Sequence, residues 1–264
     1  MQQVIEISGL TKEFVPVKNF CNYISHPIKR EKVLAIDELS LQVRRAEIFT
    51  LIGPNGAGKT TLVKILACLI SPTKGTVRIL GYDVLKDEEK IKSAIGLVGL
   101  DERSFYWRLT LRENLYFFAA LNGMNSLQTK RKIGELSSLL EIDDYLDRRF
   151  QECSSGIKQR LLIARSLLNN PSILLMDEPF KSLDSLSAKR LKNIIKVKLV
   201  GEQKKSVFFI SHNLRELEDF SDRIAIMSKG KILNMGTLEE LKNGLNPPAV
   251  SLEDVYEKAT NFRG

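Results

Sequence analysis

Short apolar runs separated by glycine-containing or polar stretches recur along most of the chain. The alternating residues 4–7 predict a half-buried strand, followed by a turn at residues 10–12, and the largely apolar runs predict buried strands. These largely apolar runs lie at 48–52, 95–98, 173–177 and 206–210. Further strands are expected within 33–43, as one or two strands, at 75–81, and in a hairpin at 224–233 around Lys229-Gly230.

Helical spacing of apolar residues appears between these runs. The region 111–149 loses its β-branched runs and places leucines at helical intervals, which predicts an inserted helical lobe. Other helices are expected after residue 61, from 154 to 170, from 185 to 199, and as two short helices in 238–260. Residues 15–32 are polar, aperiodic and contain two prolines, so we expect an irregular surface insertion there.

Composition narrows the class of protein. A hydrophobic fraction of 43% in 264 residues suffices for a sizeable core, and three cysteines without metal spacing indicate a reducing compartment. No run resembles a signal peptide or is long enough to cross a bilayer, so we expect a cytoplasmic chain, soluble or held at a membrane by a partner. The net charge is +8, but the basic clusters of the chain contain no interleaved aromatic residues. We therefore expect no nucleic-acid partner.

A glycine-rich loop follows the run 48–52 and precedes a helical pattern. It matches G-x-x-x-x-G-K-[ST], and strand, loop and helix together aim backbone N–H groups and a helix N-terminus at one phosphate. Within this loop, Lys59 is expected to meet the β- and γ-phosphates and the Thr60 hydroxyl to meet Mg²⁺. The candidate ATP-binding residues are Gly53, Pro54, Asn55, Gly56, Ala57, Gly58, Lys59, Thr60 and Thr61.

Two carboxylates end the apolar run 173–177. Nucleoside triphosphate hydrolysis needs one carboxylate to order Mg²⁺ and another to orient the attacking water or accept its proton. We assign Asp177 to the metal and Glu178 to the water.

The order of glycine loop, helical insert, Ser-x-Gly helix start and acidic strand resembles the ATPase subunit of ABC transporters over residues 4–236. The resemblance implies an α/β P-loop NTPase fold, with a RecA-like, mostly parallel core sheet, an antiparallel β subdomain and an inserted helical subdomain. It implies one domain over 1–264: an ATP-binding core of 1–98 and 159–236, a helical subdomain of 99–158 that carries the signature, and a helical tail of 237–264.

The resemblance also implies roles for residues outside the glycine loop. Ser154, Ser155 and Gly156 match the family signature, with Ser155 in place of its first glycine, and would cap the γ-phosphate of ATP held by the opposite subunit. His212 would contact the γ-phosphate and hold the catalytic glutamate and water. The segment 182–184 would lie at the dimer interface.

One position departs from the family pattern, and another has more than one candidate residue. The glutamine expected after 95–98 is absent, and Asp101 is the nearest candidate to replace it at Mg²⁺, with Glu102 as an alternative. Phe14 is the candidate to stack on adenine, and Phe20 or Tyr23 could replace it.

The function that the resemblance implies is ATP hydrolysis by a homodimer, with ATP between the subunits, that drives a separate multi-span permease from the inner face of the membrane. Residues 251–256 resemble the end of bacterial exporters, which favours export. Aromatic residues at 105–107 and 116–118 are candidates for the permease contact. The alternatives are a soluble ABC ATPase acting on nucleic acid or ribosomes, which would need coiled coils or a second cassette, and a regulator that binds nucleotide without turnover.

Overall fold

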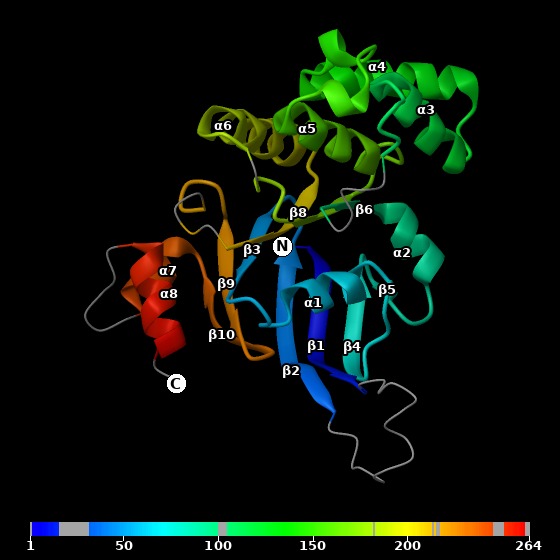
Figure 1. Cartoon of the computed structure of the whole chain (residues 1–264). Coiled ribbons are helices and arrows are strands. Elements are labelled where there is room, and N and C mark those ends of the chain that lie inside the picture. Colours follow the sequence, from blue (N-terminus) through cyan, green and yellow to red (C-terminus); the bar gives the residue numbers. More distant parts are fainter. Residues whose placement is uncertain are drawn as a thin grey trace, which may run out of the picture.

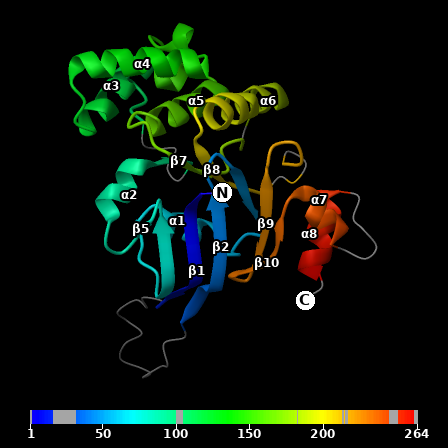
Figure 2. The ribbon, with the colours of Figure 1, turned by 180° about the vertical axis from the view of Figure 1, so that it is seen from behind.

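The computed structural model describes residues 2–15, 32–99, 105–181, 183–212, 214, 217–244 and 251–261. These residues form two sheets, a lobe of helices at one end of the molecule, and a helical tail beside one sheet edge (Figure 1). Seen from behind, the helical lobe again lies beyond the ends of the strands and the tail again flanks β9 and β10 (Figure 2). The expected fold class is confirmed.

The larger sheet has six strands in the order β10-β9-β3-β8-β7-β6. All neighbouring pairs are parallel except the β9–β10 hairpin. The strands are β3 (Ile48–Ile52), β6 (Ile95–Val98), β7 (Ile173–Asp177), β8 (Ser206–Ser211), β9 (Arg223–Ser228) and β10 (Lys231–Gly236).

Both faces of this sheet are buried, which explains why its inner strands have no polar alternation. Ile48, Met176 and Phe209 point into a core shared with the helical lobe. Phe49 and Phe208 point the other way and stack with ring centroids 5.6 Å apart in a second core. The sheet therefore separates two hydrophobic cores.

The second core is completed by an antiparallel sheet and two helices. The sheet has the order β2-β1-β4-β5, with β1 (Gln3–Phe14), β2 (Val33–Arg44), β4 (Lys74–Ile79) and β5 (Tyr82–Asp83). The turn expected at residues 10–12 is wrong, because β1 stays paired with β2 as far as Phe14 through register shifts. Helix α1 (Lys59–Leu66) was expected, whereas α2 (Glu88–Ala94) was not.

The helical lobe contains α3 (Leu111–Leu121), α4 (Ser126–Leu140) and α5 (Ser155–Ser166), with short 3₁₀ turns at Asp143–Tyr145 and Phe150–Glu152. Reciprocal capping boxes begin α3 and α4. The buried Arg160 guanidinium donates to the Leu140 carbonyl at 3.0 Å and to Glu141 Oε2 at 2.9 Å, which ties α5 to α4. The boundary proposed between residues 158 and 159 falls inside α5.

The last helices differ in regularity. The helix expected over 185–199 consists of α6 (Ser185–Asn193) followed by a π-helical stretch, η5 (Ile194–Glu202). The tail forms the two expected short helices, α7 (Leu238–Asn243) and α8 (Leu252–Asn261). Among the described residues, no helix combines the length and apolar character needed to cross a membrane.

Candidate active site

The parallel register of the core sheet brings three sequence-predicted segments to one edge. Ile52 of β3 pairs with Ser211 of β8, and Asp177 of β7 pairs with Ile210. The next residues along the chain are Gly53, His212 and Glu178. Strands that run parallel and end in register deliver their following loops to the same place.

The glycine loop runs from β3 into α1, as predicted. Gly58 has φ +106°, and a Cβ there would come within 2.4 Å of the Ala35 carbonyl oxygen. A Cβ on Gly53 would come within 2.1 Å of the Met227 carbonyl oxygen. These two positions therefore require glycine for close packing of the loop against β2 and β9. Pro54, Asn55 and Gly56 form the exposed tip of the loop, and Ala57 is buried beneath it.

Lys59 is buried beneath this loop with 7% of its surface exposed. Its Nζ donates to the carbonyl oxygens of Gly53 at 2.7 Å and Pro54 at 3.0 Å. Burial lowers the pKa of the Lys59 ammonium, and the carboxylates of Glu178 and Asp177 oppose that shift. The side chain thus places a cation at the base of the loop, where an anionic ligand would be attracted.

Thr60 in the first turn of α1 contacts Asp177 at the end of β7. Thr60 Oγ1 donates to Asp177 Oδ2 at 3.3 Å. Burial raises the pKa of Asp177 and the adjacent Glu178 carboxylate raises it further, while the Thr60 bond and the Lys59 charge act in the opposite direction. A hydroxyl and a carboxylate are hard oxygen donors of the kind Mg²⁺ takes together with phosphate oxygens and water. The described residues contain no cluster of three or more His, Cys, Asp or Glu side chains fit for a metal. Thr60 and Asp177 would supply two oxygen donors to Mg²⁺, with phosphate oxygens and water as the others.

Glu178 and His212, 34 positions apart in sequence, are in direct contact. His212 Nδ1 lies 2.7 Å from Glu178 Oε1. The Glu178 backbone has φ +50° and its N–H donates to the Ile210 carbonyl at 3.0 Å, so β8 supports this uncommon conformation for a residue with a side chain. The carboxylate and the imidazole are held together at the sheet edge.

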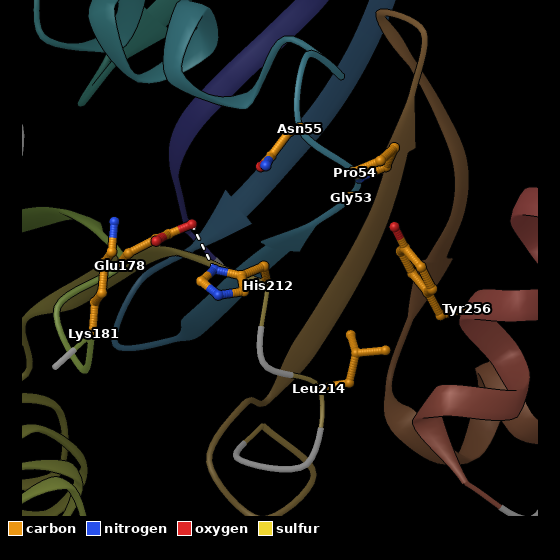
Figure 3. Close-up of a pocket in the computed structure, with 8 residues that line it drawn as sticks. All are labelled: Gly53, Pro54, Asn55, Glu178, Lys181, His212, Leu214 and Tyr256. Carbon is orange, nitrogen blue, oxygen red and sulfur yellow. Dashed lines mark hydrogen bonds and ion pairs between the residues drawn. The ribbon is translucent and has the colours of Figure 1, made fainter. Parts of the chain in front are cut away.

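These groups border a pocket of about 450 Å³. Figure 3 shows the Glu178–His212 pair on one side and the Gly53–Asn55 loop on another. The pocket is lined by Gly53, Pro54, Asn55, Glu178, Lys181, His212, Leu214 and Tyr256. The sequence did not identify Lys181, Leu214 or Tyr256 as residues of the site. Lys181 follows Glu178 in a tight turn, and the turn is closed by a hydrogen bond from the Lys181 N–H to the Glu178 carbonyl at 3.1 Å. No local sequence pattern marks Tyr256 as a site residue.

The signature residues lie apart from this pocket. Ser154 is the N-cap of α5 and accepts from the Ile157 N–H at 3.4 Å. Ser154 and Ser155 are exposed, so Ser155 in place of glycine causes no crowding within this chain. A Cβ on Gly156 would lie 3.2 Å from Ser187 Oγ, a tight contact. None of these three residues lines the pocket beside Gly53.

The remaining candidates have different outcomes. Phe14 ends β1, is 40% exposed, and carries the Lys12 ammonium 4.9 Å from its ring centroid. It does not line the pocket, so its assignment to adenine stays a prediction. Asp101 and its alternative Glu102 lie outside the described residues, as do Phe20, Tyr23 and Ser182.

Comparison with known proteins identifies the family. The family model described as "ABC transporter" matches residues 36–181. The Bacillus subtilis ABC transporter ATP-binding protein NatA is 35% identical over 213 residues, which are 81% of this chain and 86% of NatA. The chain belongs to the ABC transporter ATP-binding subunits. As a member of this family it binds ATP and is an ATPase.

Other comparisons agree with this family and with the fold. This ABC subunit is 34% identical to the Escherichia coli glycine betaine/proline betaine transport ATP-binding protein ProV over 93% of its own length, but spans only 63% of ProV. A solved structure of an ATP-binding subunit of an ABC transporter superposes with a TM-score of 0.78 at 24% identity, over 97% of this chain and 99% of that one. The ATP-binding cassette MJ0796, solved as a dimer bound to ADP and Pi, superposes with a TM-score of 0.74 at 25% identity, over 89% and 98%.

The raised pKa of Asp177 predicts a stability change with pH. Protonated Asp177 contributes to the stability of the folded chain. This contribution is fully present below the ordinary aspartate pKa of 3.8 and is lost as the pH rises through the raised pKa of Asp177 in the folded state. Asp177→Asn cannot ionise, so without nucleotide and Mg²⁺ it should melt at a higher temperature than the native chain at neutral pH. That gain should vanish near pH 3.8. Thermal melts across this range measure it.

Asp184→Asn is the control, because its melting temperature should change in the opposite direction. Hydrogen bonds from the Ser187 side chain and backbone lower the pKa of Asp184, which caps α6, so its stabilisation exists above the ordinary pKa and is lost as pH falls. At neutral pH this variant should melt at a lower temperature. A lower melting temperature for Asp177→Asn as well would contradict the assigned cost of burying that carboxylate.

Proposed function

We propose that this ABC subunit hydrolyses Mg²⁺-ATP as a homodimer and so drives transport through a separate multi-span permease, at the inner face of the cell membrane. The observation that carries the proposal is the Glu178–His212 contact beside the glycine loop. A regulator without turnover would not need a carboxylate and an imidazole paired at the mouth of the phosphate loop.

Each side chain of the site has a proposed role. The loop N–H groups and Lys59 hold the β- and γ-phosphates. Thr60 and Asp177 hold Mg²⁺, which supplies neutralisation of phosphate charge. Glu178 orients the attacking water and accepts its proton, and His212 keeps Glu178 in position through the 2.7 Å contact. Asp101 is retained as a further proposed Mg²⁺ contact from the sequence.

The chain carries two half-sites that do not meet within one subunit. The loop and Glu178 border the pocket, whereas the exposed Ser154 begins α5 in the helical lobe. A helix N-terminus with an exposed hydroxyl is suited to an anion. We therefore assign Ser154, Ser155 and Gly156 to the ATP held by the other subunit, so that ATP joins the two subunits. The domain division 1–98 with 159–236, 99–158 and 237–264 is part of the same proposal.

Glu178→Gln tests the composite site. It preserves the size of the side chain and removes the charge that activates water, so ATP should bind, hydrolysis should fall by about a hundredfold or more, and an ATP-dependent dimer should accumulate. Size-exclusion chromatography with light scattering, with and without Mg²⁺-ATP, measures the dimer.

A second substitution locates the contact that closes the dimer. Adding Ser154→Arg should abolish the dimer through bulk at the γ-phosphate, and adding Glu257→Ala, on the exposed face of α8, should leave it intact. Should Glu178→Gln bind ATP and remain monomeric both alone and with the permease, the composite site would be ruled out.

The aromatic residues expected at the permease contact divide into two groups. Phe105 is buried and packs on Phe118 and Phe150, with ring centroids 5.4 and 4.9 Å apart. Tyr106 and Trp107 are exposed at 49% and 61%. The buried rings support an exposed aromatic edge of the helical lobe, where we place the permease contact.

Trp107→Glu should reduce recovery of a multi-span protein when the tagged chain is isolated from solubilised membranes, because a charge would replace the apolar contact. Leu85→Glu is the matched control, since Leu85 is similarly exposed at 59% but precedes α2, far from this edge in sequence. Equal recovery with both variants would place the permease elsewhere, and recovery of ribosomes would favour a soluble ABC ATPase.

For direction, we propose export. The likeness of residues 251–256 to bacterial exporters supports it. A Bacillus licheniformis relative, 35% identical and spanned by the chain over 66% of its length, is named for bacitracin transport, a name that gives no direction. An Oceanobacillus iheyensis relative is named for methionine import, so the family as a whole does not decide direction. Inside-out vesicles that hold this subunit and its permease should accumulate a transported drug on adding ATP. Uptake confined to right-side-out vesicles with internal ATP would reverse the assignment.

A further inference from the structure

The C-terminal helix α8 reaches the candidate active site, although its ribbon lies to one side of the core sheet, next to α7, β9 and β10 (Figure 1). Tyr256 of α8 lines the same pocket as Gly53, Glu178 and His212. Figure 3 shows its ring entering from α8 with the hydroxyl directed toward Pro54. The tail therefore contributes a side chain to the wall of the hydrolytic pocket.

The same helix is attached to the connection that carries His212 from β8 to β9. Glu218 in this connection accepts the backbone N–H of Leu252, the first residue of α8, at 2.7 Å through Oε1. Its other oxygen, Oε2, lies 3.8 Å from Lys242 Nζ of α7. A helix N-terminus has unpaired N–H groups and partial positive charge, so a carboxylate is a favourable cap for it.

Apolar packing supports this attachment. Leu252 and Val255 are fully buried and belong to the same core as Leu217 and Phe220, which lie on either side of Glu218. Beyond them, Ser221 Oγ lies 2.7 Å from Thr50 Oγ1, and Asp222 Oδ2 accepts the Ile48 N–H at 2.8 Å. Among the described residues of this connection, Ser221 and Asp222 are therefore fixed to β3, His212 contacts Glu178, and Glu218 is bonded to α8.

We propose that α8 is a positioning element for hydrolysis, in which Glu218 anchors the helix and thereby holds His212 against Glu178 and Tyr256 in the pocket wall. This inference rests on the proposed roles of Glu178 and His212. The loss of the Glu218 anchor should act on the rate of hydrolysis more than on ATP binding, because Lys59 is held by the carbonyls of Gly53 and Pro54, and the glycine loop packs against Ala35 of β2 and Met227 of β9.

The test compares Glu218→Ala with Glu218→Gln in the full-length chain. Glu218→Ala removes the oxygen that accepts the Leu252 N–H, and should lower kcat roughly tenfold through misplacement of His212. KM and the Kd for ATP should stay within about twofold, because the substitution removes no contact that binds ATP equally in the ground state and the transition state. Glu218→Gln retains an acceptor oxygen and should recover most of kcat. Glu257→Ala on the exposed face of α8 is the control for a change in that helix.

A readout independent of turnover uses the His212 imidazole resonances in NMR spectra. The chain has two histidines, so a His26 substitution assigns the spectrum. Glu218→Ala should shift the His212 signal, and Glu218→Gln and Glu257→Ala should not. If Glu218→Ala fails to fold, Tyr256→Ala replaces it, with Tyr256→Phe as its matched variant, since Tyr256 is only partly buried.

The outcomes separate this inference from the proposed function. Unchanged kcat and an unshifted His212 signal in Glu218→Ala, while Glu178→Gln is inactive, would overturn the role of α8 and leave the hydrolytic site intact. A parallel loss of ATP affinity and kcat would also overturn it, since that indicates a general structural effect. Normal hydrolysis by Glu178→Gln would instead remove the proposed function on which the inference rests.

Discussion

The parallel alignment of β3, β8 and β7 is the constraint on which the site depends. Ile52 pairs with Ser211 and Asp177 pairs with Ile210, so all three strands end within one residue of each other. A shift of register by one residue would turn every side chain of a strand to the opposite face, and both faces here are fully buried. The packing of two cores therefore locks the register, and the register places Gly53, Glu178 and His212 at one edge.

Close packing behind the glycine loop adds a second constraint. Backbone carbonyls of Ala35 and Met227 occupy the space that a Cβ on Gly58 or Gly53 would need. These carbonyls belong to β2 and β9, one in each sheet, so the loop is wedged between the two sheets. This packing fixes the conformation of the loop, and the Lys59 ammonium is held beneath it by the carbonyls of Gly53 and Pro54.

The Glu178–His212 pair is held from two directions. On one side, the Glu178 N–H bonds to β8, which supports a left-handed backbone that would otherwise be unfavourable. On the other, the connection after His212 is fixed to β3 by Ser221 and Asp222 and to α8 by Glu218. The helical lobe, in contrast, carries the exposed Ser154 at the start of α5, apart from the pocket, as the proposed capping of ATP in a second subunit requires.

The sequence by itself determined the elements whose signals are local. The glycine loop with Lys59 and Thr60, the acidic strand end at Asp177, the helical insert and the two tail helices all follow from patterns within a few residues, and the structure places them as expected. The family followed from the order of these motifs. The turn expected at residues 10–12 was wrong because pairing with β2 overrides local turn chemistry, and α2 was missed because only Ile91 of its residues is buried. The Glu178–His212 contact was expected only through the family resemblance and not from any local pattern. Tertiary structure alone decided the Glu218 cap on α8 and the position of Tyr256, which join residues separated by 34 positions or more. Such contacts depend on strand order and register, which are set by burial of the whole sheet and have no signature in any single segment.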